Sequence, residues 1–179
     1  VLSDEIYSNY RTKQLKSILS YKYKKAIITK SFSKSHAMTG FRIGYVTAEP
    51  PIIEKMSKLQ ALSLTNVSEP IQYVALQALK ASKHGSYPTP ENQKIIQSRL
   101  EALIKIAKDI GLEFIEPDGA MYLFAKTKYK DFDATKFSEK LLEYGVAIAP
   151  GEGFGDYKEF FRITAIDETK LKEGMTILD

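Results

Sequence analysis

The stretch SFSKSHAMTGFRIGY, residues 31–45, carries the strongest fold and function signal in this sequence. It places two hydroxyls and Lys34 directly after a short apolar run, residues 26–29, that is typical of a buried strand. Arg42 follows Lys34 at a spacing of eight residues and stands between two glycines. Hydroxyl and guanidinium groups bind phosphate oxygens, and glycines allow the backbone to approach a ligand closely. The stretch therefore predicts a phosphate site beside a lysine amine.

The lysine amine in this stretch is a candidate nucleophile. A lysine among other cations, partly withdrawn from water, has a lowered pKa, so that its neutral amine can attack a carbonyl carbon. Nine basic residues and no acidic residue lie between Tyr10 and Ala48, in a chain whose net charge is +4. Such a segment attracts anions, although we expect most of these lysines to lie on a solvated face.

The composition excludes several classes of protein. The 179 residues contain no cysteine and two histidines, which argues against a disulfide scaffold, a cysteine nucleophile and a metal centre. No run approaches the roughly 18 consecutive apolar residues of a membrane helix. The first residues turn acidic at once, unlike a signal peptide. We therefore expect a cytoplasmic protein without a metal or a membrane partner.

Strand and helix patterns alternate along the chain, which predicts an α/β or mixed α+β class. We expect strands at residues 26–29, 41–48, 112–115, 120–125, 146–149 and 160–164. We expect helices from Pro50, at residues 68–80, at residues 90–110, between Asp133 and Gly145, and from about Asp167. The turn-rich segment at residues 84–90 divides residues 1–87 from residues 88–179 as two domains.

Two other motifs partly match the basic segment. Residues 31–34 fit the Ser-x-x-Lys of penicillin-recognising serine enzymes, but the Ser-Asp-Asn and Lys-Thr-Gly motifs of those enzymes do not occur. The YKYKK run at residues 21–25 has the aromatic and basic residues of a nucleic-acid surface. It is short and isolated, so a solvent-facing loop explains it and we expect no nucleic-acid partner.

The stretch at residues 31–45 resembles the cofactor-lysine segment of class I and II aminotransferases, which are pyridoxal-phosphate enzymes of the aspartate aminotransferase fold. Further matches follow in the order of that family and cover essentially the whole chain: DEIY at 4–7, PDGAMY at 117–122, VAIAPGEGFG at 146–155 and FRI at 161–163. The resemblance implies that residues 1–87 are the C-terminal part of a large cofactor-binding domain with a mixed or mainly parallel sheet. Residues 88–179 would form a small α+β domain.

The resemblance also implies how the cofactor is held. Lys34 would form the Schiff base with pyridoxal 5′-phosphate and would shuttle a proton during the reaction. Asp4 would pair with the pyridine nitrogen and keep it protonated. Tyr7 would donate a hydrogen bond to the ring oxygen.

Three more residues receive roles from the resemblance. Ser31 and Arg42 would bind the cofactor phosphate, and Arg162 would grip the substrate carboxylate in a bidentate pair. His36 and His84 are interpreted as structural.

The implied reaction moves an amino group between an L-amino acid, of the aspartate or aromatic type, and a 2-oxo acid, in a protein that is a homodimer. Full members of the family are about twice as long as this chain. We therefore expect a C-terminal fragment that is inactive by itself. Two alternatives stay open, namely a non-catalytic or truncated relative and a carbon–sulfur lyase or synthase of the same fold.

Overall fold

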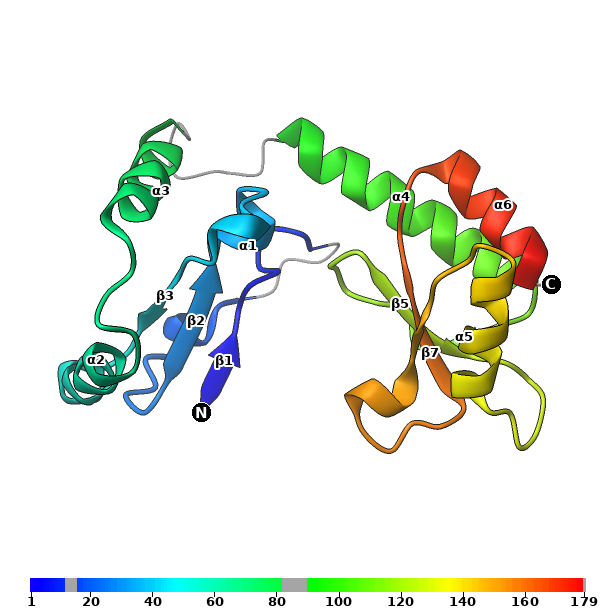
Figure 1. Cartoon of the computed structure of the whole chain (residues 1–179), viewed down its shortest axis with the longest axis horizontal. Helices are drawn as coiled ribbons and strands as arrows, with labels where there is room; N and C mark the ends of the chain where they lie inside the picture. Colours follow the sequence, from blue (N-terminus) through cyan, green and yellow to red (C-terminus); the bar gives the residue numbers. More distant parts are fainter. Residues whose placement is uncertain (12–15, 82–89, 179) are drawn as a thin grey trace. The chain divides into compact units, whose positions relative to one another are not determined.

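The structure, a computed structural model, describes residues 1–11, 16–81 and 90–178. These residues form two compact units, Val1–Glu91 and Asn92–Asp179, which are traced in Figure 1. The predicted division between residues 87 and 88 lies outside the described residues, as does His84.

The first unit is built on a three-stranded mixed sheet of β1 (Leu2–Asp4), β2 (Ile27–Ser31) and β3 (Gly44–Thr47), in that order (Figure 1). β1 is parallel to β2, and β3 is antiparallel to it. Ile28, at the centre of the β-branched run of β2, is 2% exposed. Because parallel strands end at the same edge of a sheet, the last residues of β1 and β2 share one edge. That edge carries Asp4 and Ser31.

Short helical segments follow the strands of this sheet. A single turn, α1 (Phe32–Ser35), continues directly from β2, and a 3₁₀ turn, η2 (Thr39–Phe41), precedes β3. Another 3₁₀ turn, η1 (Ile18–Tyr21), precedes β2. Phe32 and Met38 are buried together with Ala75 of α3 (Glu69–Ala81), which forms a small core.

The helix α2 (Pro50–Leu64) begins at the Pro-Pro pair, as predicted, because proline is favoured in the first helical turn. The apolar stripe of α2 is only partly covered within the described residues, since Ile52, Ile53 and Met56 are half-buried and Leu59 is exposed. No residue of α2 is buried, and Leu59 and Leu62 are 65% and 86% exposed. A helix with this much exposed leucine is typical of a surface that another chain segment covers.

The second unit is built on a four-stranded antiparallel sheet. Its strands, in order across the sheet, are β4 (Glu113–Phe114), β5 (Tyr122–Lys126), β7 (Phe160–Thr164) and β6 (Ala149–Pro150). The remaining elements are α4 (Pro90–Asp109), α5 (Ala134–Glu143), η4 (Gly151–Phe154) and α6 (Glu168–Leu178).

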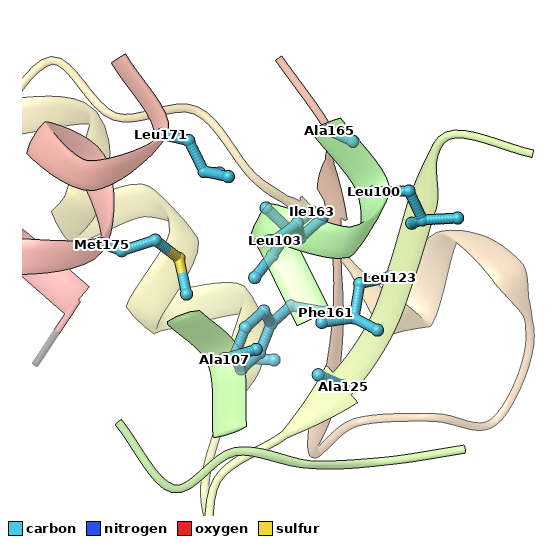
Figure 2. Close-up of a cluster of buried hydrophobic side chains, with 11 residues drawn as sticks. Leu100, Leu103, Ala107, Leu123, Ala125, Phe161, Ile163, Ala165, Leu171 and Met175 are labelled. Carbon is cyan, nitrogen blue, oxygen red and sulfur yellow. The ribbon is translucent and has the colours of Figure 1, made fainter. Parts of the chain in front are cut away.

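The core of the second unit lies on one face of this sheet. Alternate residues of β5 and β7 point to it, namely Leu123, Ala125, Phe161 and Ile163, and all four are buried. Figure 2 shows them converging with side chains of α4 and α6. Leu100, Leu103 and Ala107 supply the α4 contribution, so they form the buried face of the helix predicted at residues 90–110.

Predicted capping residues fix the ends of two helices. The Asp133 carboxylate accepts a hydrogen bond from the Lys136 amide at 3.0 Å and caps α5. Gly145 and Gly111 follow α5 and α4 at φ +78°, a left-handed conformation that glycine adopts without strain.

Three predicted strands are clearly shorter than expected, and one of them, predicted at 112–115, is only Glu113–Phe114. The strand predicted at 41–48 begins at Gly44, because residues 39–41 form a 3₁₀ turn and Arg42 is left-handed. The strand predicted at 146–149 pairs only at Ala149 and Pro150. Within the residues that the structure describes, no helix is long and apolar enough to cross a membrane, and no group of three acidic or histidine side chains is arranged to bind a metal.

Candidate active site

Asp4 ends β1 at the shared edge of the first sheet. Its register partner on β2 is Thr29, whose Oγ1 donates a hydrogen bond to Asp4 Oδ1 at 3.3 Å. The Ile6 amide donates to the same oxygen at 3.1 Å. Both bonds orient the carboxylate through Oδ1, which leaves Oδ2 able to accept a bond from a ligand.

Ser31 ends β2 and caps the turn that follows it. Its Oγ accepts a hydrogen bond from the Ser33 amide at 3.0 Å, with extended backbone angles of φ −139° and ψ 147°. The hydroxyl proton goes to the Ile43 carbonyl at 3.3 Å, which is long for a hydroxyl donor. The donor of Ser31 is therefore held loosely and can turn toward an anion.

Lys34 lies on the single turn of α1, partly buried, directly beyond the sheet edge. The Phe32 carbonyl accepts the His36 amide at 3.0 Å, which closes the turn. The Ser33 carbonyl accepts Thr39 Oγ1 at 3.1 Å, and the Lys34 carbonyl accepts the Tyr10 hydroxyl at 2.9 Å. The backbone that carries Lys34 is thus fixed by hydrogen bonds from three residues, His36, Thr39 and Tyr10.

Arg42 follows η2 in the left-handed conformation, at φ 50° and ψ 47°. This conformation is costly for a residue with a Cβ, and such strain clusters at functional sites. The Arg42 guanidinium donates one bond, to the Thr39 carbonyl at 2.9 Å, and the side chain is exposed. A guanidinium carries five donors, so most remain for an anion.

The two glycines that flank Arg42 differ in the space around them. A Cβ on Gly44 would lie 2.6 Å from the Lys30 carbonyl oxygen, so only glycine lets β3 pair with β2 at this point. Gly40 has no atom within 4 Å of such a Cβ. The close approach at Gly44 is to the neighbouring strand β2, and the approach of a ligand at these glycines stays a prediction.

Tyr7 lies in the turn that follows β1 and is partly buried. The Ser8 amide bonds to the Glu5 carbonyl at 3.0 Å, and the Tyr10 amide bonds to the Tyr7 carbonyl at 2.9 Å. These two bonds fold the chain back sharply after Asp4, so the whole predicted DEIY motif belongs to one tight segment.

Glu5 holds this segment in place through its side chain, a role that the sequence does not predict. Its side chain is buried, with Oε1 accepting bonds from Ser17 Oγ at 2.7 Å and the Ile18 amide at 3.2 Å. Lys30 Nζ lies 3.7 Å from Oε2. Burial raises the pKa of Glu5, but the bonds from Ser17 and Ile18 and the nearby cations outweigh burial, and the pKa lies below its ordinary value. A single sequence offers no signal for such a contact.

His36 packs against Phe32 with the two rings tilted and their centroids 4.9 Å apart, and its Nδ1 lies 2.7 Å from Ser35 Oγ. Burial lowers the pKa of the imidazole, which favours the neutral form at neutral pH. Packing of this kind agrees with the structural role predicted for His36.

Arg162 lies on β7 in the second unit, on the face of the sheet opposite the core. Its guanidinium carbon lies 4.4 Å from the centre of the Tyr122 ring and 4.9 Å from that of Phe154. Arg162 Nε is buried and has no hydrogen-bond partner among the described residues. A buried, unpaired guanidinium nitrogen is costly unless a ligand completes it.

Aromatic side chains hold this second site in place. Phe124 stacks on Phe160 at 5.1 Å and meets Phe154 edge-on at 5.8 Å. Gly151 allows η4 to pass close to β7, since a Cβ there would lie 2.6 Å from the Phe160 carbonyl oxygen. The loop that carries Phe154 is therefore pressed against the strand that carries Arg162.

The structure thus brings Asp4, Ser31 and Lys34 to one edge of the first sheet, with Tyr7 and Arg42 in the turns beside them. The residues with a supporting role that the sequence did not reveal are Glu5, Tyr10 and Thr39.

Comparison with known proteins gives consistent matches. The chain is 34% identical to an aspartate aminotransferase of Pyrococcus horikoshii, over 100% of this chain and 47% of that protein. It is 32% identical to aromatic-amino-acid aminotransferase 2 of Thermococcus litoralis, over 98% of this chain and 46% of that one. The crystal structure of an aspartate aminotransferase from Thermotoga maritima covers 99% of this chain with a TM-score of 0.88 at 31% identity, and 46% of its own length is matched. The chain spans about half the length of the curated relatives it matches.

The sequence matches the family described as aminotransferase class I and II over residues 1–178. The fold, a mixed sheet followed by an antiparallel unit, is that of the pyridoxal-phosphate-dependent aminotransferases that it matches in structure. The chain therefore belongs to the class I and II aminotransferase family.

Proposed function

We propose that this chain carries the cofactor lysine and the substrate arginine of a pyridoxal-phosphate-dependent aminotransferase. The proposed reaction moves an amino group between an L-amino acid, of the aspartate or aromatic type, and a 2-oxo acid. One observation carries the proposal. A carboxylate at Asp4 and an amine on the turn after Ser31 extend from the carboxyl ends of two adjacent parallel strands, where α/β sheets bind ligands.

The side chains at this edge fit the chemical groups of pyridoxal phosphate. Asp4 Oδ2 can accept a bond from the pyridine nitrogen, since the recorded bonds to the carboxylate go to Oδ1. The loosely held hydroxyl of Ser31 and the spare donors of Arg42 suit a phosphate. Tyr7, in the turn after β1, is the proposed donor to the ring oxygen. Lys34 Nζ is the proposed point of covalent attachment.

Bound pyridoxal phosphate supplies an aldehyde and an electron-withdrawing ring. The chain's own residues would direct that chemistry. Asp4 would hold a positive charge on the ring nitrogen through a charge-assisted bond. Lys34 Nζ would accept and return a proton as a general base and acid. Gly44 lets the strand that follows Arg42 pair tightly with β2, which keeps Ser31 and Arg42 on one short loop.

Arg162 is the proposed ligand of the substrate carboxylate. The rings of Tyr122 and Phe154 hold its planar guanidinium, and its Nε awaits an acceptor. A carboxylate can accept two parallel bonds from such a group, which fixes the orientation of an amino acid. The names of several relatives support the substrate class, because these relatives are aspartate and aromatic-amino-acid aminotransferases and an asparagine–oxo-acid transaminase.

A homodimer is the proposed assembly of the active protein. The exposed leucines of α2 support the proposal, since a surface of this kind needs to be covered. Because the chain spans about half of its relatives, we also propose that activity requires residues beyond those of this sequence.

The proposal is tested by amino-group transfer from aspartate and from phenylalanine to a 2-oxo acid, in the active protein that contains this chain, saturated with pyridoxal phosphate. Lys34→Ala is expected to abolish transfer, because the proton carrier and the attachment point are lost together. Lys24→Ala, an exposed lysine of the same basic segment, is the matched control and is expected to keep full activity. Transfer that survives Lys34→Ala would refute the role of Lys34, and elimination without transfer would favour a lyase.

A further inference from the structure

Tyr10 and Lys34 are 24 residues apart in the sequence and joined by a hydrogen bond. The Tyr10 hydroxyl donates to the Lys34 carbonyl oxygen at 2.9 Å, in a partly buried position.

The bond matters because of where it falls on the turn that carries Lys34. A helix of one turn leaves its carbonyls without partners inside the helix, and other groups must supply them. The Ser31 carbonyl accepts Ser35 Oγ at 2.9 Å, and the Ser33 carbonyl accepts Thr39 Oγ1 at 3.1 Å. These donors come from residues close in sequence. The Lys34 carbonyl instead accepts its hydrogen bond from a residue distant in sequence, Tyr10.

Tyr10 itself is tied to the segment that holds Asp4 and Tyr7. Its amide donates to the Tyr7 carbonyl at 2.9 Å, so the tyrosine closes the turn after β1. The amide of the neighbouring Glu5 bonds to the Thr29 carbonyl at 3.0 Å and joins this segment to β2. Tyr10 therefore spans the two segments of the site, with its backbone in one and its hydroxyl on the other.

We propose that Tyr10 is a positioning residue for Lys34, whose hydroxyl sets the lysine turn relative to the segment of Asp4 and Tyr7. The proposal rests on the function proposed for Lys34. Without the hydroxyl, the turn after Ser33 loses the bond that joins the Lys34 carbonyl to the first segment. The Lys34 amine then samples more orientations, and capture of an aldehyde slows because fewer of them are productive.

Tyr10→Phe removes the hydroxyl and keeps the ring. Tyr45→Phe is the matched control, because Tyr45 belongs to the same unit and its ring meets Phe32 of the same turn at 5.9 Å. The Tyr45 hydroxyl makes no hydrogen bond with the described residues. Both variants lose one oxygen atom near α1, so any difference between them reports the bond to Lys34.

The first measurement is amide hydrogen exchange of the full chain without added cofactor. The His36 and Met38 amides, which bond to the Phe32 carbonyl, report the lysine turn, and the Ile27 amide, bonded to Val1, reports the sheet. In Tyr10→Phe we expect exchange about fivefold to tenfold faster at His36 and Met38, the effect of one lost hydrogen bond. Ile27 should be unchanged, as should all three amides in Tyr45→Phe. Equal exchange in the two variants would overturn the proposal, as would a uniform rise at all three amides.

The second measurement is the rate at which pyridoxal phosphate becomes fixed to Lys34. The amine adds to the aldehyde, water leaves, and borohydride reduces the resulting carbon–nitrogen bond to a secondary amine that peptide mapping locates. We expect Tyr10→Phe to slow fixation at Lys34 about threefold to tenfold, with fixation at the exposed Lys24 unchanged. An unchanged rate at Lys34 would overturn the proposal. If wild-type protein fixes no cofactor at Lys34, the proposed function fails, and the exchange measurement still decides the role of Tyr10.

Discussion

Gly44 faces Ser31 across the pair of β2 and β3, and a Cβ on Gly44 would lie 2.6 Å from the carbonyl oxygen of Lys30. The Gly44→Ala variant must therefore push the two strands apart at the residue that precedes the lysine turn. We expect a loss of about 1–3 kcal/mol in the free energy of unfolding, as for other overpacked sites. Urea unfolding followed by circular dichroism measures it.

Gly40→Ala provides the control for this prediction. A Cβ on Gly40 has no atom within 4 Å, and its φ is not in the left-handed region. We expect a change within about 0.5 kcal/mol. Equal losses in the two variants would show that the glycines matter for a reason other than space at β2.

The buried carboxylate of Glu5 predicts a dependence of stability on pH. Its pKa in the folded protein lies below the ordinary value of 4.5, so the ionised form stabilises the fold. The contribution is complete above about pH 5 and is lost as the pH falls through the folded pKa. Glu5→Gln should cost about 1 kcal/mol at pH 7, because Gln keeps an acceptor for Ser17 but loses the ion pair with Lys30.

The difference between wild type and Glu5→Gln should shrink when unfolding is measured at successively lower pH from 7 to 3. Glu54→Gln is the control, since Glu54 pairs with Lys58 on the exposed surface of α2. Exposed pairs of this kind contribute little. A gap between wild type and Glu5→Gln that stays constant over this range would contradict the assigned ionisation.

Arg162 lies between the rings of Tyr122 and Phe154, and this arrangement predicts that lysine cannot replace it. Arg162→Lys keeps the charge but loses the planar fork and the stacking surface. In the active protein that contains this chain, we expect KM for the amino acid to rise about tenfold or more, the effect of one lost charge-assisted bond. Fixation of pyridoxal phosphate at Lys34 should be unchanged, because that lysine belongs to the other unit.

Lys126→Gln is the control for Arg162, because Lys126 lies on the same sheet face and its Nζ is 5.7 Å from the centre of the Phe160 ring. We expect KM to stay unchanged in this variant. A KM that responds equally to both changes would assign the effect to the charge of the face and not to Arg162.

The loop that carries Phe154 predicts a similar contrast between two glycines. A Cβ on Gly151 would press on the Phe160 carbonyl oxygen at 2.6 Å, whereas a Cβ on Gly153 meets nothing within 4 Å. Gly151→Ala should lose about 1–3 kcal/mol of stability, and Gly153→Ala should stay within about 0.5 kcal/mol of wild type. Thermal unfolding of both variants checks the contrast, and equal midpoints would contradict the close approach of η4 to β7.

Much of the fold could be predicted from the sequence because its signals are local. The alternation of residues 160–164 predicts β7 with its observed bounds, and Asp133 and Gly145 bracket α5 as helix caps should. The first residue of the strand predicted at 41–48 was wrong, because a composition rich in β-formers does not reveal that Arg42 adopts a left-handed conformation. The apolar stripe of α2 predicted a helix correctly but not what covers it, since periodicity identifies a face and not its partner.

The residues of the candidate site also fall into those that the sequence predicts and those that it does not. Asp4, Ser31 and Lys34 stand out in the sequence because they lie at strand ends in a motif. Tyr10 and Glu5 do not, because their bonds cross 24 and 12 residues of chain and depend on how β1 packs beside β2. Contacts of this kind form only when the sheet is assembled, so no local pattern in the sequence predicts them.

The central claim is that Lys34 is the residue to which pyridoxal phosphate attaches. The most direct test is to add pyridoxal phosphate to the purified chain, reduce with borohydride and locate the adduct by peptide mass spectrometry. The account predicts a yellow complex in which the adduct forms at Lys34 faster than at the exposed lysines. An adduct spread over exposed lysines such as Lys22 and Lys24, with none at Lys34, would contradict it.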